Sequence, residues 1–365
     1  MIREHAISIK GKSHIQSGKP LQDAYRIVTL PNGYRVAAVA DGVGSCLHSA
    51  KGAEIAVKSV TDFIYNNFPL DGCSIPIKSM LRTSFGHALI QIQREAMSNR
   101  HSLSDYDTTL MVVVYGGGNK PTYIASCGDG GVVGLKMNGA YEALNVRQNH
   151  EGHVIPLRAG YEFWTIDEFT EPLASVLIST DGLMDQFRNN NLNPGFYIPL
   201  LMLFADPFVI QYLKRKGVNI SKVVTHGQTG YNKVLLNALY YVLHRNYRFN
   251  KVTVSKIIGD IMRNGTPFEL LRKIQDDKTF VCLYNTFALP KPMNIQYYAE
   301  PDWKEVSANL QKKLYPSLFE EQKPTLQEGE EPVSVQSKPL ERRIEIPNLT
   351  DEINTRIVLR ISKNE

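Results

Sequence analysis

The chain has 365 residues, of which 43% are hydrophobic and 21% are charged, and it carries a net charge of +5 at pH 7. These values are typical of an ordinary globular protein and allow one large domain with an appendage, or two domains. No run of Lys and Arg dominates, and no stretch approaches the roughly 18 apolar residues of a membrane span, so we expect neither nucleic acid nor a membrane as partner. The four cysteines are scattered and form no Cys-x-x-Cys pair, which favours reduced thiols and a cytoplasmic location.

Residues 1–185 are predicted to alternate strands with two helices. Apolar residues at helical spacing predict helices over 50–68 and 77–92. Apolar runs separated by glycine-rich turns predict three successive strands, at 108–115, 122–127 and 132–137. Short turns between neighbouring strands favour an antiparallel sheet, so the pattern indicates layers of sheet and helix.

The second half of the chain is expected to begin with an insert. Residues 188–272 start with an Asn-rich loop and continue with apolar residues at helical spacing, most clearly over 232–244, which indicates a helical insert. A buried strand is then expected over 279–288.

The last part, residues 291–365, is predicted to be a linker followed by a strand-forming tail. Residues 316–340 are rich in Pro, Glu, Gln, Lys and Ser and poor in apolar residues, which is linker composition. Alternating polar and apolar residues predict strands near 343–346 and 353–361.

Acidic residues stand at the ends of several predicted strands. Two Asp-Gly pairs, which begin at Asp41 and Asp181, each close an apolar run, and further acidic turns occur at Asp23 and Asp276. A carboxylate at the end of a buried strand is costly unless it is paired, and no matching set of Lys or Arg accompanies these four, which suggests a divalent cation. Hard oxygen ligands select magnesium or manganese, and two such ions can hold a bridging water and lower its pKa for phosphoryl transfer. Taken singly, each acidic residue would be an ordinary turn residue.

Seven short motifs follow one another along the first 290 residues: Gly11-Lys-Ser-His14, Gly18-Lys-Pro-Leu-Gln-Asp-Ala24, Val39-Ala-Asp-Gly-Val-Gly-Ser45, Asp107-Thr-Thr-Leu110, Ser126-Cys-Gly-Asp129, Ser179-Thr-Asp-Gly-Leu-Met-Asp185 and Asp276-Asp-Lys-Thr279. In this order they resemble the motifs of the metal-dependent protein phosphatases, the protein phosphatase 2C class, most closely a bacterial-type branch. The resemblance implies an α/β four-layer sandwich of two antiparallel β-sheets flanked by helices. The acidic turns at Asp181 and Asp276 bracket the helical insert in the sequence, so we expect it near the active site. The resemblance also implies hydrolysis of phosphoserine and phosphothreonine on proteins, as signalling opposite a serine/threonine kinase.

Carried over residue by residue, the resemblance gives the acidic residues their roles. Asp41 would bridge two manganese or magnesium ions, and Asp181 and Asp276 would hold the first of them. The carbonyl of Gly42 and the carboxylate of Asp23 would hold the second, since a glycine lets its backbone approach an ion closely.

Several positions leave alternatives open. Asp129 matches the position of a weaker third metal, and its alternative is an ordinary turn residue. Many members have Glu where this chain has Gln22, which removes a charge from the second metal site. Many also have a phosphate-binding Arg where this chain has Gly18, and Lys19 or His14 could substitute. A lysine is a point charge rather than a bidentate fork, and His14 could protonate the leaving oxygen or be a structural histidine.

The sequence therefore predicts a metal-dependent serine/threonine phosphatase in which Asp41, His14 and Lys19 serve the reaction and metal-held water attacks phosphorus in one step. No Cys-x5-Arg loop is present, which argues against a thiol phosphatase. Two alternatives stay open: a phosphatase-like interaction module with little turnover, favoured by Gln22 and Gly18, and a phosphatase of a small phosphorylated metabolite. The tail could bind a protein partner or cover a sheet edge.

Overall fold

The computed structural model describes most of the predicted body and only a small part of the chain after it. The described residues are 1–69, 76–150, 153–187, 203–218 and 273–290, with residues 237, 240, 241, 244, 251, 255 and 271. All of them belong to one compact unit, Met1–Phe319. The predicted tail, 291–365, and most of the predicted helix at 232–244 lie outside the described residues.

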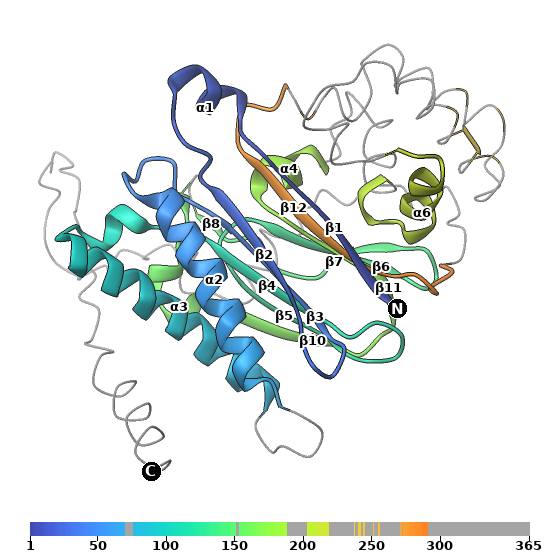
Figure 1. The fold of residues 1–365 in the computed structure, drawn as a ribbon, viewed down its shortest axis with the longest axis horizontal. Coiled ribbons are helices and arrows are strands. Elements are labelled where there is room, and N and C mark those ends of the chain that lie inside the picture. The colour runs from blue at the N-terminus through green and yellow to red at the C-terminus, as the bar shows by residue number, and fades with distance from the viewer. Residues whose placement is uncertain are drawn as a thin grey trace, which may run out of the picture. The chain divides into compact units, whose positions relative to one another are not determined.

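Two five-stranded antiparallel sheets form the centre of the molecule (Figure 1). The first sheet has the order β1 (Ile2–Ile9), β12 (Lys278–Asn285), β11 (Leu173–Ser179), β6 (Gly131–Lys136) and β7 (Tyr141–Ala143). The second has the order β10 (Thr165–Phe169), β5 (Thr122–Cys127), β4 (Leu110–Tyr115), β3 (Arg35–Asp41) and β2 (Asp23–Thr29). A small separate pair joins β8 (Asn149–His150) to β9 (His153–Val154).

Strand β3 shows why a continuous apolar run suits this arrangement. Ala37 and Val39 pack between the two sheets, in the same cluster as Val281 of β12. Val36 and Ala38 belong instead to the cluster that includes the helices. Successive side chains of a strand point to opposite faces, so a strand that is covered on both faces must be apolar at every position.

Two long helices cover the outer face of the second sheet. They are α2 (Ser49–Asn67) and α3 (Ile77–Asn99), which confirm the helices predicted at 50–68 and 77–92. Ala56 of α2 and Phe85 of α3 are fully buried in one cluster with Val36 and Ala38 of β3. The helices therefore bury the face of β3 that points away from the other sheet.

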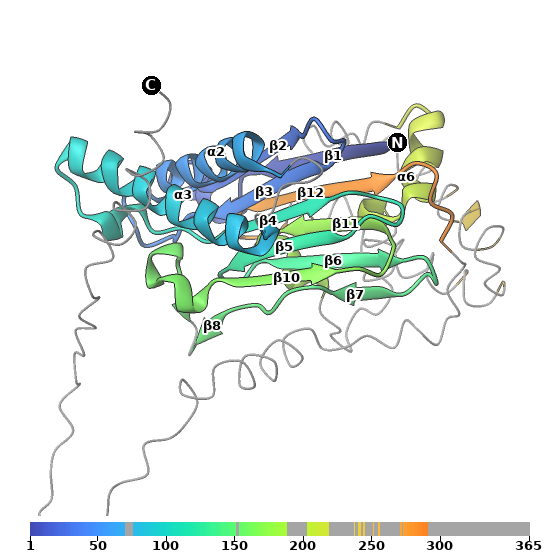
Figure 2. The ribbon, with the colours of Figure 1, turned by 90° about the horizontal axis from the view of Figure 1, so that it is seen from below.

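A third helix, α6 (Pro207–Arg215), lies against the first sheet and falls within the predicted insert. Asp206 caps it by accepting a hydrogen bond from the backbone N–H of Phe208 (2.8 Å). His5 of β1 donates from Nε2 to the carbonyl of Phe204 (2.8 Å), which ties the segment before the helix to the sheet. Figures 1 and 2 both place α6 near the N-terminal end of β1. Helices thus flank both sheets, and the four-layer sandwich is confirmed.

One predicted connection is wrong in a way that matters for the site. The strands predicted at 108–115, 122–127 and 132–137 are present as β4, β5 and β6, but only β4 and β5 are neighbours. The turn around Asp129 carries the chain from the second sheet to the first, where β6 pairs with β11. Gly128 has a φ of +111°, which favours glycine, and a Cβ on Gly130 would overlap the side chain of Met111. Asp129 therefore lies on a crossover between the two sheets.

The remaining elements are short. They are α1 (Lys12–Ser17), α4 (Asp181–Met184) and the 3-10 turns Leu103–Tyr106, Leu157–Ala159, Tyr161–Phe163 and Asp185–Phe187. The strand predicted at 279–288 is confirmed as β12. None of the helices described here has the length and apolar character to cross a membrane.

Candidate active site

Strand β3 ends at Asp41, and two threonines before β4 fix the turn at its end. The backbone N–H of Asp41 donates to Thr109 Oγ1 (2.9 Å), and the N–H of Thr109 returns a bond to the Asp41 carbonyl (2.8 Å). Thr108 Oγ1 donates to the same carbonyl (2.8 Å). A Cβ on Gly42 would lie 2.7 Å from the backbone of Ser49, so glycine is required at this corner. The position of the Asp41 carboxylate is thus set by a rigid backbone.

A second corner is built where β11 and β12 meet. The two strands are antiparallel neighbours, so Asp181, which comes after β11, lies near Asp276, which precedes β12. Gly182 packs directly on the carbonyl of Asp277, where any larger residue would collide with the backbone. The Asp-Gly pair at Asp181 therefore lets α4 approach the turn before β12.

These corners surround a pocket of about 140 Å³, whose lining includes Asp41, Asp181, Asp276, Asp129 and Gly42. Asp23 does not line the pocket; it is 6% exposed, and its Oδ2 accepts a hydrogen bond from Thr180 Oγ1 (2.9 Å). Asp23 was predicted in a turn, but it is the first residue of β2. We call Asp23, Asp41, Asp181 and Asp276 the strand-end aspartates.

Desolvation and mutual repulsion raise the pKa values of the strand-end aspartates. Although Asp41 opens onto the pocket, the surrounding protein raises its pKa well above the ordinary value, and the charges of Asp23 and Asp181 add to the effect. Desolvation, followed by the neighbouring aspartates, raises the pKa of Asp181 to about 7. The pKa of Asp23 rises to about 8, through desolvation and then the charge of Asp277. A cation among these groups would favour their charged forms.

The basic side chains near the pocket form hydrogen bonds with groups other than the carboxylates of the strand-end aspartates. Arg147, which the sequence analysis did not single out, is buried; it donates from Nη2 to Asp185 (2.9 Å) and from Nε to the carbonyl of Asp129. Lys278 donates from Nζ to two backbone carbonyls at 3.3 Å. Within the described ranges, no Lys or Arg forms an ion pair with a strand-end aspartate. These basic side chains therefore do not neutralise the charge of the strand-end aspartates.

The donor atoms fit a hard divalent cation. Among the described residues, no three His, Cys, Asp or Glu side chains are already grouped so that they could hold an ion. Asp23 Oδ1 and Asp181 Oδ1 are nevertheless buried without a hydrogen-bond partner. Buried carboxylate oxygens without donors are costly, and oxygen-only ligand sets suit manganese and magnesium.

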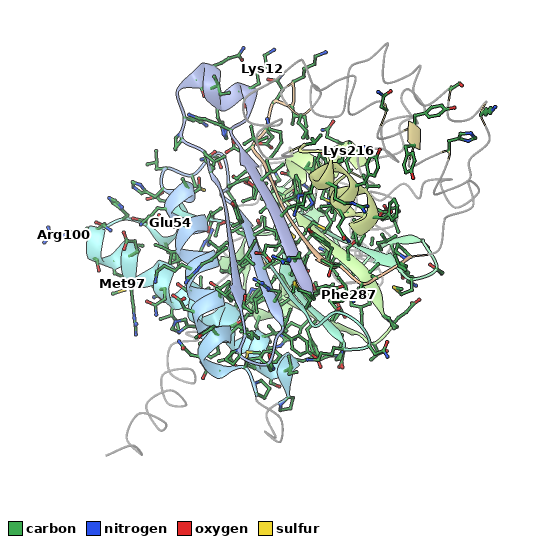
Figure 3. The ribbon with its side chains drawn as sticks, turned by 45° about the vertical axis from the view of Figure 1, so that its right-hand side comes forward. Lys12, Glu54, Met97, Arg100, Lys216 and Phe287 are labelled. Carbon is green, nitrogen blue, oxygen red and sulfur yellow. The ribbon has the colours of Figure 1, made fainter. Side chains whose placement is uncertain are left out.

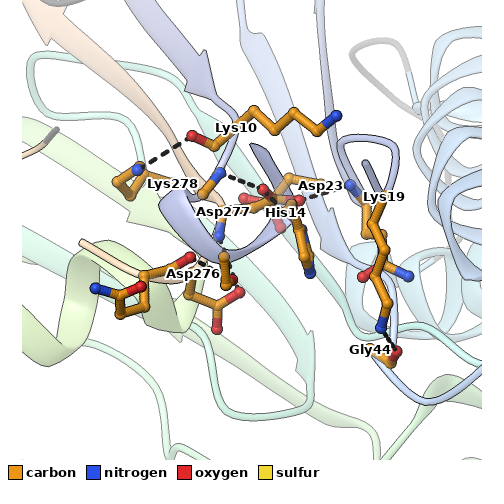
Figure 4. Close-up of polar contacts among 12 residues, drawn as sticks. Lys10, His14, Lys19, Asp23, Gly44, Asp276, Asp277 and Lys278 are labelled. Atoms are coloured by element: carbon orange, nitrogen blue, oxygen red, sulfur yellow. Dashed lines mark hydrogen bonds and ion pairs between the residues drawn. The ribbon is translucent and has the colours of Figure 1, made fainter. Parts of the chain in front are cut away.

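Asp277 joins the start of the domain to its last strand, a role that the sequence analysis did not predict. Its Oδ1 accepts a hydrogen bond from the N–H of Gly11 and its Oδ2 from the N–H of Gln22, both at 2.6 Å. The N–H of Asp277 also donates to Asp276 Oδ1 (2.8 Å). Figure 4 shows Asp277 next to His14 of α1, with Asp23 and Asp276 nearby. The carboxylate fixes the loop on which the candidate phosphate-binding residues lie.

His14 is a residue of α1, and Lys19 follows this helix. His14 lines the pocket, and its Nδ1 is 3.0 Å from Asp277 Oδ1, although the geometry is not that of a hydrogen bond. Lys19 is exposed and donates from Nζ to the carbonyl of Gly44 (3.0 Å), which also lines the pocket (Figure 4). Gly18 ends α1 with a φ of +73°, a conformation that would strain an arginine.

Gln22 is 5% exposed and lines the pocket. Its Nε2 donates to Ser49 Oγ (2.7 Å), which leaves Oε1 buried and without a hydrogen-bond partner. The amide therefore offers a neutral oxygen that can serve as an ion ligand with less charge than a carboxylate.

Comparison with known proteins identifies the family of the chain. The family model described as protein phosphatase 2C matches residues 10–217. Similar solved structures include the serine/threonine phosphatase Stp1 from Staphylococcus aureus (12% identity, 78% of this chain and 95% of that one, TM-score 0.45). The catalytic domain of PstP in complex with two manganese ions is 14% identical (78% and 97%, TM-score 0.43). PppA of Pseudomonas aeruginosa, described as a key regulatory component of T6SS, is 16% identical (78% and 97%, TM-score 0.43). No curated protein sequence matches the chain. With its family match, the chain belongs to the protein phosphatase 2C family.

Proposed function

We propose that this protein is a metal-dependent serine/threonine phosphatase that releases phosphate from phosphoserine and phosphothreonine in proteins. The observation that carries the proposal is the pocket itself, where Asp41, Asp181 and Asp276 converge without a basic partner among the described residues. Divalent cations bound by these carboxylates could activate a water molecule for phosphoryl transfer. Membership of the protein phosphatase 2C family suggests that the reaction is phosphate hydrolysis. A phosphoprotein substrate, a kinase acting in the opposite direction and a cytoplasmic location belong to the same proposal.

The proposed metal ligands are those that the family resemblance implies, and the pocket supports the proposal by bringing most of them together. Asp41, Asp181 and Asp276 would hold one manganese or magnesium ion, with Asp41 shared by a second. The Gly42 carbonyl and Asp23 would serve the second ion. When bound, the ions supply a water of lowered pKa and neutralise phosphoryl charge.

Two further pocket residues are proposed to extend the metal site. The unpartnered Gln22 Oε1 would replace the carboxylate that many relatives carry beside the second ion. Asp129 would contribute to a third ion, and its desolvation raises its pKa in the metal-free protein. Arg147, by holding the carbonyl of Asp129, would orient this carboxylate.

Lys19 and His14 are proposed to handle the substrate. Lys19 at the pocket rim can leave the Gly44 carbonyl and bind a phosphate oxygen as a point charge. His14, held near Asp277, can donate a proton to the oxygen that leaves the phosphorus. Because Gly18 adopts a left-handed conformation, the arginine of many relatives has no equivalent at this position.

The decisive experiment measures manganese-dependent release of phosphate from a phosphothreonine peptide. Asp41→Ala, Asp181→Ala and Asp276→Ala should each reduce turnover by roughly a hundredfold or more, since each removes charge that stabilises the transition state. Asp62→Ala, on the exposed side of α2, is the control and should retain full turnover. Near wild-type turnover in any of the three pocket variants at saturating manganese would contradict the site.

The same assay separates the alternative functions. Calorimetric binding of manganese without turnover on any phosphopeptide would favour a phosphatase-like interaction module. Faster turnover of a small phosphorylated metabolite than of phosphopeptides would favour a metabolite phosphatase. Turnover that prefers the phosphothreonine peptide supports the proposal.

The proposed domain organisation is a catalytic domain at 1–290 and a linker and tail at 291–365. Residues 188–272 lie in sequence between Asp181 and Asp276, so we propose that this insert selects the phosphoprotein substrate. We propose that the strand-forming residues 343–362 bind a protein partner by strand addition. A soluble truncation after Pro290 that hydrolyses a small aryl phosphate at the full rate would support this accessory role, whereas aggregation and loss of activity would contradict it.

A further inference from the structure

A second and larger pocket, of about 550 Å³, lies at the other end of β12. It is lined by Arg3 of β1, by one face of α6 and by Tyr284 and the residues just after it. Tyr284 is near the end of β12 opposite Asp276, roughly 25 Å away at about 3.3 Å per residue of extended strand. In Figure 3, Lys216 marks the end of α6 and Phe287 the turn after β12, and the pocket lies between these two segments. It is therefore separate from the candidate active site.

Three basic side chains line this second pocket, at Arg3, Lys214 and Arg215. No carboxylate lines it among the described residues. Glu4, the nearest acid along β1, alternates to the other side of the strand and pairs with Arg35 (3.3 Å). The described lining of the pocket consequently carries a net positive charge.

The cations are held in position by the sheet and the helix. Arg3 is paired with Tyr284 in the β1–β12 register. Lys214 Nζ lies 2.8 Å from Tyr284 Oη and 5.3 Å from the centre of the same ring. Lys214 and Arg215 also stand in the last turn of α6, where the helix dipole stabilises cations. Arg3 belongs to a strand, so the helix dipole does not explain its position. The convergence of three like charges therefore points to an anion.

The remaining lining is apolar or uncharged. Phe208 and Leu289 provide apolar surface, and Leu289 is 74% exposed. Gln211 and Thr286 add amide and hydroxyl groups beside the cations. The volume is within the range of about 300–1,000 Å³ typical of small-molecule sites.

We infer that this second pocket binds a small organic phosphate, in which a phosphate or diphosphate group is joined to an apolar or aromatic part. The guanidinium groups of Arg3 and Arg215 match the phosphate oxygens, since Arg presents planar pairs of donors. Phe208 and Leu289 provide the apolar surface for an aromatic part. The inference is independent of the proposed catalytic function because it uses none of the strand-end aspartates.

The test uses the full-length protein, with EDTA present so that no divalent ion links a phosphate to the active site. Isothermal titration calorimetry measures binding of ADP, of pyrophosphate and of adenosine. ADP should bind saturably and more tightly than either pyrophosphate or adenosine, because it engages both the cations and the apolar wall. Arg3→Gln and Arg215→Gln should each weaken ADP binding by about tenfold, equivalent to one charge-assisted hydrogen bond. Both side chains are exposed, so unchanged thermal unfolding will show that the variants fold.

The matched control is Arg94→Gln, which removes one exposed positive charge from α3 on the opposite side of the sandwich. It should change ADP affinity by less than twofold, and all three variants should hydrolyse the phosphothreonine peptide at the wild-type rate. No saturable binding of ADP would overturn the inference. So would ADP binding that Arg3→Gln and Arg215→Gln leave unchanged, or binding no tighter than that of pyrophosphate.

Discussion

Asp23 and Asp41 stand directly opposite each other in the register of β2 and β3. Two carboxylates are thus cross-strand neighbours at the end of the sheet, where like charges destabilise the pair. Desolvation is the largest cause of the raised pKa of each residue, and the charge of Asp23 is the next cause for Asp41. The arrangement that suits a bound cation therefore weakens the metal-free protein.

Asp41→Asn is expected to stabilise the metal-free protein while it abolishes phosphatase activity. The amide removes a repulsion of up to about 1 kcal/mol, which corresponds to an increase in Tm of about 2 °C for a domain of this size. Scanning fluorimetry in EDTA measures this shift, and added MnCl2 should then raise the Tm of the wild type more than that of the variant.

Asp62→Asn is the control, and its expected effect on Tm is the opposite of that of Asp41→Asn. Asp62 is on the surface of α2 and pairs with Arg26 (2.7 Å) and Lys58 (3.1 Å), so its loss should leave the Tm unchanged or lower it slightly. A lower Tm for Asp41→Asn than for the wild type in EDTA would contradict the electrostatic argument.

Thr109→Val should reduce catalysis through the backbone of Asp41. Valine keeps the shape of threonine but leaves the Asp41 N–H without its 2.9 Å acceptor, which costs about 1–3 kcal/mol and loosens the corner. We expect kcat/KM to fall by about tenfold or more at saturating manganese, as misplaced catalytic groups lose rate steeply.

Thr61→Val is the matched control for this prediction. Thr61 is a buried threonine of α2 whose hydroxyl donates to the Val57 carbonyl (2.7 Å), away from the pocket. It should lose stability by a similar or smaller amount and keep its kcat/KM. Equal losses of activity in both variants would assign the effect of Thr109 to general destabilisation.

Lys19→Ala should weaken phosphate capture. Removing the rim cation is expected to lower kcat/KM by about tenfold, on the order of 1.4 kcal/mol. Lys12→Ala is the control. Lys12 is an exposed residue of α1, and its loss removes the same charge seven positions earlier, so kcat/KM should change by less than twofold. Steady-state kinetics at low ionic strength measures both, and identical effects would reduce the role of Lys19 to general electrostatic attraction.

His5 should make folding stability sensitive to acid. Desolvation lowers its pKa from 6.5 to about 4, despite the hydrogen bond to the Phe204 carbonyl, and the charge of Lys214 adds to the lowering. Between these pH values the unfolded chain binds a proton that the native protein does not, so stability falls as the pH falls from about 6.5 to 4.

The His5→Gln variant isolates this contribution, since glutamine can still donate to the Phe204 carbonyl but does not titrate. Urea unfolding at pH 7.5 and pH 4.5 should show a loss in the wild type that exceeds the loss in the variant by about 2–3 kcal/mol. Equal pH dependence in the two proteins would show that His5 is protonated without penalty.

The sequence predicted the elements whose signal is local. Apolar spacing located α2 to within one residue at each end, over 50–68 against Ser49–Asn67. Helix α3 continues seven residues past the predicted end at 92, because its last two turns are mostly polar and exposed and give no apolar stripe. The sheet crossover at Asp129 could not be predicted, since a short glycine turn serves a hairpin and a change of sheet equally well.

For the candidate site, the motifs located the acidic residues but not the contacts that hold them. Asp41, Asp181 and Asp276 were predicted together and do line one pocket. The hydrogen bond from Gly11 to Asp277 spans 266 positions, and nothing in either local sequence specifies it. Arg147 was likewise missed because its role depends on Asp185, which reaches it only in the folded protein.

The pairing of β1 with β12 sets the order in which the domain can be completed during synthesis. Strand β1 is at the edge of its sheet, and its neighbour there is β12, made more than 260 residues later. A chain still short of β12 also lacks Asp276 and the Asp277 carboxylate that anchors Gly11 and Gln22. A chain that ends before β12 therefore lacks both the strand that pairs with β1 and the carboxylate that holds the loop after β1.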